Sequence, residues 1–536
     1  MTENSGATLG SESSNDSGDK GLRTKSLDLA SSIVIGMSST APGYSIAASL
    51  GWIVAYVAYQ SPALVLLGFI PILCIAYAYR ELNRETPDCG TTFTWATRVF
   101  NPWVGWMGGW GYVTASIIAM ASASQIAGQY FYLMFGADGL ASSAVWVTAG
   151  GVAWIIIFTW VSWKGVAVSA RLQYWFLAIE IIVLVIFSVI ALVKVYGGTA
   201  APTAVNPDLS WFNPFQVRTD SGSLDFSAIS GGLLLAVFLF WGWDSSLSLN
   251  EETSEPDKTP GRAAVISTVL LLAVYALTAT ACLAYAGADP LNESDDVLAE
   301  IGALVLGTHF DKMLIFAVLT SAAATTQTTI MPTARTLLSM SAFQAIPKKF
   351  ARIHPKNLTP SYATIFTGIA SIVFFVGLAS ISSNVLGDAT EAVSLLVAFY
   401  YGLTGFAGAW HYRNRAGSTL HQKFTRIVMP AFGGIVLLYI FLQTAYDNFN
   451  PDNSSTVIGI FGLQMGGIFV ISIGTLLLGV VLMFITARTH KEFFSGRALN
   501  RHTPIVIGDE IFGTPAALTL PDSTSREHLV IPPEDL

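Results

Sequence analysis

The sequence predicts an all-α polytopic membrane protein that crosses the bilayer about twelve times. Only 62 of its 536 residues are charged, 27 basic and 35 acidic, whereas 52% are hydrophobic. The charged share of 12% is about half that of an ordinary soluble protein. The apolar residues also fall in charge-free runs of about 20, long enough to cross roughly 30 Å of hydrocarbon as helices. Together these observations exclude a soluble protein of several domains.

Twelve apolar runs, bounded by charges and by Gly, Pro and Asn clusters, mark the expected spans. They begin near residues 29, 61, 103, 143, 172, 228, 263, 313, 361, 389, 427 and 457. Residues 1–27 are polar and are expected to form a disordered cytoplasmic tail. Residues 490–536 are expected to form a cytoplasmic extension that either regulates the protein or only solvates it.

The basic residues predict the orientation of these spans. Only Lys194, Arg218 and Lys312 fall in the odd-numbered loops, and the other 24 of the 27 Lys and Arg residues lie in the even-numbered loops or the tails. Loops rich in Lys and Arg stay in the cytoplasm. We therefore expect a multi-pass protein of the cell membrane with both termini cytoplasmic.

The composition also argues against several classes of chemistry. The three cysteines cannot build a disulfide framework, and the seven histidines show no metal-ligand spacing. We find neither a phosphate-cradling P-loop nor a nucleophile with a neighbouring base. We expect no enzyme activity, no cofactor, no bound metal and no nucleic-acid partner, and the lack of a P-loop disfavours ATP-driven transport.

Two of the spans are interrupted at matching positions. The first breaks at residues 38–43 (SSTAPG) and the sixth at residues 241–246 (WGWDSS). Because five spans separate them, their helices run in opposite directions, as in two inverted repeats. We expect the first repeat over residues 28–200, the second over 201–415, and two extra spans over 416–489.

A break within hydrocarbon exposes N–H and C=O groups, so it persists only where protein, water or a ligand satisfies them. Helix N-termini suit an anionic group, and free carbonyls suit an ammonium or a cation. Two facing breaks therefore predict a polar site for a zwitterion or an amine. The alternative is an ordinary Pro kink in one span and a Gly in the other.

Two carboxylates lie inside spans, where an unpaired charge costs a few kcal/mol. Asp244 follows the sixth break and is a candidate amine contact or proton carrier, or it caps the next helix through an N–H such as that of Leu247. Glu180 lies nine residues after Arg171, about 14 Å along the helix, so Arg171 cannot neutralise it there. Glu180 suits a proton or a Na⁺ site, or it is a protonated carboxyl bonded to a neighbouring helix.

Further polar and aromatic groups surround these spans. The eighth span carries hydroxyls, Thr325 among them, that either line an ion site against the first span or bond back to their own helix. Aromatic residues, including Tyr401, either cover the site or pack in the core or against lipid.

Three segments resemble the amino acid-polyamine-organocation permeases. They are the loop and third span RELNRETPDCGTTFTWATRVFNPWVGWMGGWGY, the sixth span FLFWGWDSSLSLNEETSEPDKTPGR, and the loop TARTLLSMSAFQAIPKKFARIHPKNLTPSYA after the eighth span. The sixth-span segment is the most specific, since Asp244 stands at the family's acidic position. The resemblance extends over roughly residues 25 to 490 and implies a leucine-transporter-like fold, a 5+5 inverted repeat with alternating access.

The resemblance also implies a substrate site. The first-span backbone would meet a substrate carboxylate and the sixth-span carbonyls its amine, with the site formed by Ser39, Thr40, Ala41, Pro42, Gly43, Phe240, Trp241, Gly242, Trp243 and Asp244. Two features depart from the family. Pro42 has no N–H to offer a carboxylate, which makes an amine without a carboxylate plausible. Glu180 stands where proton-coupled relatives often carry a Lys, so the sign of that site is reversed.

We therefore expect a secondary transporter, a symporter that imports a small amino acid together with H⁺. The expected coupling residues are Glu180, Asp244 and Thr325. Coupling to Na⁺, a polyamine or organic-amine permease, and an exchanger remain alternatives, as does a membrane sensor that binds the same ligand without moving it. The expected partners are the substrate, the ion and the lipid bilayer, and the sequence does not predict the oligomeric state.

Overall fold

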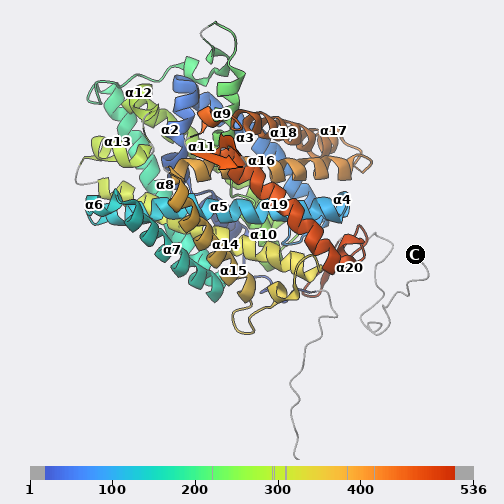
Figure 1. Ribbon diagram of the computed structural model, residues 1–536. Coiled ribbons are helices and arrows are strands. Elements are labelled where there is room, and N and C mark those ends of the chain that lie inside the picture. Colours follow the sequence, from blue (N-terminus) through green and yellow to red (C-terminus); the bar gives the residue numbers. More distant parts are fainter. Residues whose placement is uncertain are drawn as a thin grey trace, which may run out of the picture.

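The computed structural model describes residues 19–512 apart from residues 220, 293, 295, 308–310, 383, 416, 455 and 461. Helices dominate the described chain, and the prediction of an all-α polytopic membrane protein is confirmed (Figure 1). Nine helical segments in the described ranges are long and apolar enough to cross a membrane. One of them, Leu29–Glu85, has 57 residues, enough for more than one crossing at about 1.5 Å per residue.

The first part of the chain forms eight α-helices, which are α1 (Leu29–Thr40), α2 (Pro42–Val57), α3 (Ser61–Glu85), α4 (Thr92–Val99), α5 (Pro102–Met134), α6 (Asp138–Ala141), α7 (Ala144–Lys164) and α8 (Val166–Tyr196). The next eight are α9 (Phe226–Leu239), α10 (Ser245–Ser248), α11 (Thr259–Ala286), α12 (Ala288–Asn292), α13 (Val297–Leu306), α14 (Asp311–Ala342), α15 (Ser361–Ile381) and α16 (Val385–Tyr412). The chain then forms α17 (Leu420–Lys423), α18 (Met429–Asp447), the hairpin β1 (Val457–Ile460) and β2 (Leu463–Gly466), α19 (Gly467–Thr489), α20 (Lys491–Phe494), and the strands β3 (Ile505–Ile507) and β4 (Glu510–Phe512).

Most predicted spans begin within a few residues of an observed helix, but the last one does not. The prediction that it starts near residue 457 is wrong, because β1 and β2 pair there as an antiparallel hairpin. The residues of β1 include Val457, Ile458 and Ile460, whose β-branched side chains favour strands. Gly462 turns the hairpin with φ of 84°, and the helix starts only at Gly467. The fifth span also differs, since α8 already starts at Val166.

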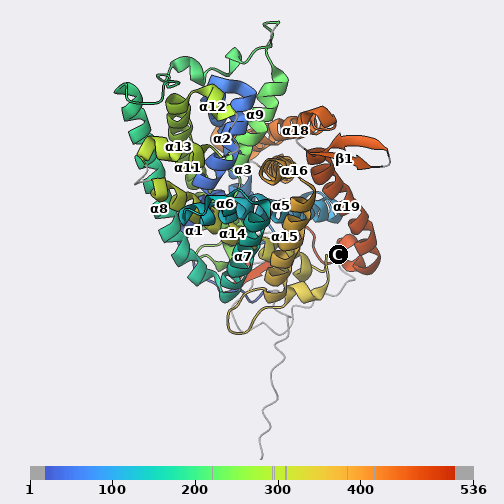
Figure 2. The same cartoon turned by 60° about the vertical axis from the view of Figure 1, so that its left-hand side comes forward.

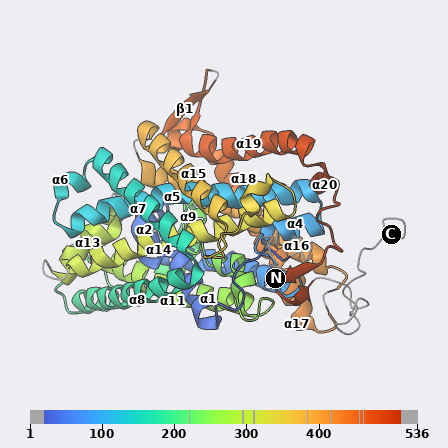
Figure 3. The same cartoon turned by 90° about the horizontal axis from the view of Figure 1, so that it is seen from below.

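The long helix α5 crosses the middle of the molecule and packs against α14, α16 and α7 (Figure 1). Seen from below, α8 and α11 run along one side and α19 along the opposite side (Figure 3). The β1–β2 hairpin projects beside α18 and α19 (Figure 2). Large apolar side chains of α8, such as Trp175, Ile182 and Val193, are more than half exposed. This outward apolar surface is what contact with lipid requires.

The described ends of the chain are packed against the helices. Residues 19–27 lie within the tail predicted to be disordered, yet Leu22 and Leu27 are buried, and the Leu27 N–H donates to the carbonyl of Glu252. In the C-terminal extension, Phe493 is fully buried and stacks on Phe93 of α4 at 5.4 Å between ring centroids. The prediction of a disordered tail is therefore wrong for residues 19–27, and residues 1–18 lie outside the described chain.

Candidate functional site at the two helix breaks

The first break is a single residue. Helix α1 ends at Thr40, Ala41 takes the left-handed conformation with φ of 47° and ψ of 73°, and Pro42 begins α2. A proline suits the first position of a helix, where an N–H would have no partner within the helix. Because a left-handed conformation is unfavourable for a residue with a Cβ, Ala41 holds local strain that the surrounding packing maintains.

The N-terminus of α2 is capped by a side chain from another span. The N–H of Gly43 donates to Oε1 of Glu180 at 2.6 Å. The N–H of Tyr44 donates to the hydroxyl of Ser321 on α14 at 3.0 Å, and this hydroxyl donates to the same Oε1 of Glu180 at 2.7 Å. Glu180 is fully buried on α8. A carboxylate in this position is favoured by the N–H groups and the positive end of the helix dipole.

The amides around the first break are all accounted for. Ala41 donates to the carbonyl of Met37, Pro42 has no N–H, and Ser45 donates to the carbonyl of Ala41. The N–H groups of Gly43 and Tyr44 are taken by Glu180 and Ser321. The resemblance assigned the backbone of Ser39 to Gly43 to a substrate carboxylate, but the N–H groups of residues 41–45 are occupied by the protein itself.

The sixth-span break is longer. Helix α9 ends at Leu239, and α10 begins only at Ser245. Within it, Gly242 has φ of 120°, and a Cβ built there would lie 2.6 Å from the carbonyl oxygen of Ser39. Only glycine fits this conformation and this close approach. The hydroxyls of Ser39 and Ser245 also hydrogen-bond at 2.6 Å, so the two breaks touch each other.

Asp244 is buried at the second break, with 1% of its surface exposed. Its Oδ1 accepts from the hydroxyl of Tyr401 at 2.9 Å and its Oδ2 from the hydroxyl of Tyr400 at 3.2 Å, both on α16. The alternative that Asp244 caps the next helix is not observed, because its side chain makes no capping hydrogen bond to α10. The indole N–H of Trp241 donates to the Tyr400 hydroxyl at 2.6 Å.

Thr325 connects α14 to the first break. Its hydroxyl lies within hydrogen-bond distance of the carbonyls of Ser38 and Ser39, at 3.3 and 3.1 Å. The neighbouring Thr326 and Thr328 instead bond back to carbonyls of their own helix. Thr325 therefore lies beside the two breaks, as the sequence suggested for at least one of these hydroxyls.

The geometry brings together most of the residues singled out from the sequence. Ser39, Gly242 and Thr325 meet directly, and Glu180 joins them through Gly43. Thr40 contributes its carbonyl to the hydroxyl of Ser45. The packing around Phe240, Trp241 and Trp243 is aromatic, with Phe240 against Tyr275, Trp241 against Phe238, and Trp243 against Tyr79 and Tyr401.

Sequence reasoning missed Tyr400, which donates to Asp244. Tyr401 stood only among the aromatic residues that cover a site or pack in the core, and Ser321, which donates to Glu180, stood among the eighth-span hydroxyls expected either to line an ion site against the first span or to bond back to their own helix. The available signal was the Tyr400–Tyr401 pair, two phenols inside an apolar span that need polar partners there.

A buried ion-pair network includes Glu251 and Glu252, which follow the second break in the chain. Nζ of Lys20 lies 2.6 Å from Oδ2 of Asp88 and 2.5 Å from Oε1 of Glu251. Next to it, the guanidinium of Arg335 binds both oxygens of Glu252, at 2.7 and 3.1 Å. We call the face formed by residues 19–27, 86–91, 249–258 and 490–512 the charged face.

The Lys20 pairs change the titration of their members. Burial alone would lower the pKa of Lys20, but the carboxylates of Asp88 and Glu251 raise it well above its ordinary value. Burial would raise the pKa of Asp88, yet Lys20 and hydroxyl donors such as Ser339 hold it below its ordinary value. These shifts favour the charged forms of Lys20 and Asp88, whereas burial raises the pKa of Glu251 above its ordinary value.

Asp88, Cys89 and Glu251 also lie close enough together to ligate a metal ion. The ammonium of Lys20 already binds the two carboxylates. A metal ion there would have to displace Lys20, so the arrangement fits an internal cation.

The long apolar helices, the lipid-facing surface and the paired breaks define a polytopic membrane transporter. A family model of amino acid permeases matches residues 27–473, and the chain belongs to this family.

The low-affinity putrescine importer PlaP of Escherichia coli strain K12 is 23% identical over 415 residues, which cover 76% of this chain and 84% of that protein. The D-serine/D-alanine/glycine transporter of E. coli strain CFT073 is 24% identical over 363 residues, 67% of this chain and 74% of that protein. An uncharacterized transporter of Mycobacterium tuberculosis is 27% identical over 353 residues, 64% of this chain and 71% of that protein. The protein is thus a transporter and not an enzyme, as the sequence predicted.

Proposed function

We propose that this permease imports a small organic amine or polyamine that lacks an α-carboxylate, driven by inward proton movement. The observation that carries the proposal is the capping of α2 by Glu180. The carboxylate of Glu180 occupies the N–H of Gly43 and, through Ser321, also satisfies that of Tyr44. A substrate carboxylate would have to displace this buried acceptor and would meet its negative charge.

The second break offers the substrate a negatively charged group, the carboxylate of Asp244. Asp244 holds two carboxylate oxygens at the break, and each oxygen accepts one tyrosine hydroxyl and keeps capacity for a further donor. An ammonium group presents three donors and a positive charge. In the proposal, Asp244 and the carbonyls around Phe240, Trp241, Gly242 and Trp243 bind the amine, while residues Ser39 to Gly43 form the opposite wall.

A cavity of about 490 Å³ near the start of α9 and the end of α18 supports a cationic substrate. Its described lining includes Asp447 and Asp452 and contains no basic residue. The negative charges of this lining would concentrate cations in the cavity.

Glu180 is the proposed proton site. Its Oε1 accepts two hydrogen bonds, whereas Oε2 is buried without a partner among the residues that the structure describes. A proton on Oε2 leaves both accepted bonds in place. Thr325 and Asp244 are the other proposed coupling residues, and Na⁺ at the oxygens around Thr325 is the alternative ion.

The proposal also includes the orientation of the chain in the membrane and its two inverted repeats. We place both described chain ends on the cytoplasmic side of the cell membrane, because Lys20 pairs with Asp88 and Phe493 stacks on Phe93, which puts both ends on the charged face. The two inverted repeats are taken as residues 28–200 and 201–415, with two extra spans after them.

A zwitterionic α-amino acid is the second candidate substrate, because one relative is a D-serine/D-alanine/glycine transporter. Uptake into proteoliposomes separates the two. Putrescine, ethanolamine, glycine and D-serine are offered under an inward pH gradient, then under a Na⁺ gradient. We expect accumulation of the two amines under the pH gradient alone. Accumulation of only the amino acids would refute the amine assignment, and binding without any uptake would make the protein a sensor.

A further inference from the structure

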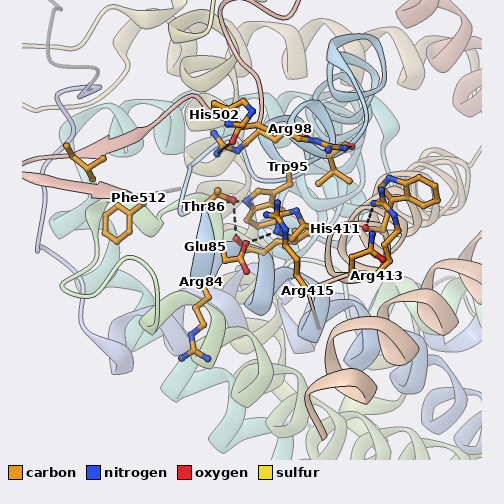
Figure 4. Close-up of a pocket in the computed structure, with 16 residues that line it drawn as sticks. Arg84, Glu85, Thr86, Trp95, Arg98, His411, Arg413, Arg415, His502 and Phe512 are labelled. Carbon is orange, nitrogen blue, oxygen red and sulfur yellow. Dashed lines mark hydrogen bonds and ion pairs between the residues drawn. The ribbon is translucent and has the colours of Figure 1, made fainter. Parts of the chain in front are cut away.

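A second cavity, of about 800 Å³, opens at the end of α3 and α4 and beside the end of α16 (Figure 4). Its walls come from residues 82–86, 95–99 and 410–415, and from residues 501–502 and 511–512 of the C-terminal extension. A cavity of this size suits a ligand as large as a nucleotide, since ligand sites typically measure about 300–1,000 Å³. None of its described lining residues belongs to the two helix breaks.

The lining is strongly basic. It holds the five arginines Arg84, Arg98, Arg413, Arg415 and Arg501 and a single carboxylate, Glu85. Oε2 of Glu85 pairs with Nε2 of His411 at 2.7 Å, and Figure 4 shows both side chains in the middle of the cavity. Among the described residues, Arg84, Arg413 and Arg415 form no ion pair with an acidic side chain. The cavity therefore carries a large uncompensated positive charge.

Several of these arginines are held in place by neutral groups. Arg98 donates to the carbonyls of Thr503 and Arg501, and Arg501 donates in return to the carbonyls of Arg98 and Val99. The guanidinium of Arg413 stacks on Trp410 at 4.1 Å and donates to its carbonyl at 2.6 Å. For Arg413, a carbonyl oxygen and a ring face orient the guanidinium without neutralising its charge. The charges are thus positioned before any ligand arrives.

We propose that this cavity binds an anion bearing one or more phosphate groups. The planar donor fork of arginine matches phosphate oxygens in pairs, and several forks around one cavity suit a ligand with several negative charges. The phosphate belongs either to a soluble molecule such as a nucleotide or to a phospholipid headgroup at the membrane surface. Such a ligand would join α3, α16 and the C-terminal extension, and would hold the extension in place.

The test measures binding to the purified full-length protein in detergent, with ATP and inorganic phosphate as probes and isothermal titration calorimetry as the readout. The double variant Arg84→Ala/Arg415→Ala removes two arginines without an acidic partner. The matched control is Arg352→Ala, which removes one exposed arginine outside the cavity. We expect the double variant to weaken ATP binding by about tenfold or more, as the loss of charge-assisted hydrogen bonds predicts, and the control to leave it unchanged.

A second arm identifies the source of the phosphate. Protein in nanodiscs of phosphatidylglycerol is compared with protein in nanodiscs of phosphatidylcholine, without soluble ligand. A higher melting temperature with phosphatidylglycerol that the double variant abolishes assigns the site to a lipid headgroup, and ATP binding that the double variant abolishes assigns it to a soluble ligand. Equal binding by the double variant and the wild type, or no response of the wild type to any of the probes, would overturn the proposal. Because transport is not measured, these outcomes do not depend on the substrate of the central site.

Discussion

The polar groups at the two helix breaks find their hydrogen-bond partners in different ways. At the first break the interruption is one residue long, and the N–H groups that it would expose are taken by Glu180 and Ser321. At the sixth-span break the interruption spans five residues and ends at Asp244, a carboxylate held by the hydroxyls of Tyr400 and Tyr401. A buried carboxylate from another helix thus occupies the first break, whereas the second break carries a carboxylate of its own.

This difference shows how one scaffold can select different substrates. A helix N-terminus inside a membrane attracts whichever carboxylate can reach it, either from the substrate or from the protein. Here the protein supplies one, and a hydrogen bond to a charged group contributes about 1.5–3 kcal/mol. A substrate therefore gains little at the first break from a carboxylate of its own.

Replacing Asp244 with Asn should have the largest effect on transport. The amide keeps the shape of the side chain, but its single oxygen accepts from only one of the hydroxyls of Tyr400 and Tyr401, and it loses the charge that binds an ammonium. Removing one partner of a buried ion pair costs about 3–5 kcal/mol, which corresponds to a loss of uptake of several hundredfold. Initial rates of amine uptake in proteoliposomes measure this loss. Undiminished uptake would remove Asp244 from the substrate site.

Gly242→Ala and Ala41→Gly form a matched pair that tests the backbone of each break. A Cβ at Gly242 meets the Ser39 carbonyl oxygen at 2.6 Å and requires φ of 120°, so we expect a loss of about 3 kcal/mol in stability. Glycine at position 41 instead relieves the strain at φ of 47° and should stabilise the protein by up to about 1 kcal/mol. Thermal unfolding in detergent compares the two. Equal shifts in both variants would contradict the observed backbone geometry.

Lys20→Met tests whether the charged face ties the ends of the two broken spans together, since Lys20 precedes α1 and Glu251 follows α10. The variant leaves Asp88 and Glu251 as neighbouring buried carboxylates, and we expect a loss of about 2 kcal/mol in stability. Cys89 is fully buried beside them and should then react with a maleimide about tenfold faster. The measurement uses a background in which Cys74 and Cys282 are replaced by Ala. An unchanged labelling rate would mean that Lys20 does not hold this face closed.

The stabilisation that Lys20 and Asp88 contribute depends on pH. The raised pKa of Lys20 makes its contribution complete below its unfolded value of about 10.4, and that contribution is lost as the pH rises through the folded value. The lowered pKa of Asp88 makes its contribution complete above about 3.9, and that contribution is lost as the pH falls through the folded value. Labelling of Cys89 in the wild-type lysine background, corrected for thiol ionisation, should therefore accelerate as the pH rises through the folded pKa of Lys20 or falls through that of Asp88.

Glu180→Gln should have the smallest effect on binding. The amide oxygen can still accept from Gly43 and Ser321, so the cap remains, but the proposed proton site is lost. We expect accumulation driven by the pH gradient to fall by about tenfold, while exchange of labelled for unlabelled substrate is partly preserved. Normal accumulation by this variant would exclude Glu180 from coupling.

The sequence predicted the breaks and their carboxylates because each violates a strong rule. Pro42 and Gly242 interrupt apolar runs, and Asp244 and Glu180 place charge in hydrocarbon. Their partners could not be predicted, because Ser321 lies 141 residues from Glu180 and Tyr400 lies 156 residues from Asp244. Hydroxyls are common in such helices and usually bond within their own helix.

Local composition did not predict the observed structure at the start of the last span and before the first. Residues 457–460 are as apolar as a helix start but form a strand, since a short apolar run does not distinguish the two structures. Lys20 lies in a segment whose composition is that of a disordered tail, but the segment is held by long-range partners, among them Asp88 and Glu251 at Lys20 and the carbonyl of Glu252 at Leu27. The basic cavity likewise joins arginines from four segments, residues 82–86, 95–99, 410–415 and 501–502, which no local pattern reveals.

The central claim is that Glu180 stands in for a substrate carboxylate at the first break. Uptake of matched pairs that differ by one carboxylate tests it most directly, with putrescine against ornithine and ethanolamine against serine, in the same proteoliposomes under the same pH gradient. The account predicts that putrescine and ethanolamine accumulate and that their carboxylated counterparts neither accumulate nor compete. Preference for ornithine or serine would contradict it, because their carboxylates would then have found a donor that the structure assigns to Glu180.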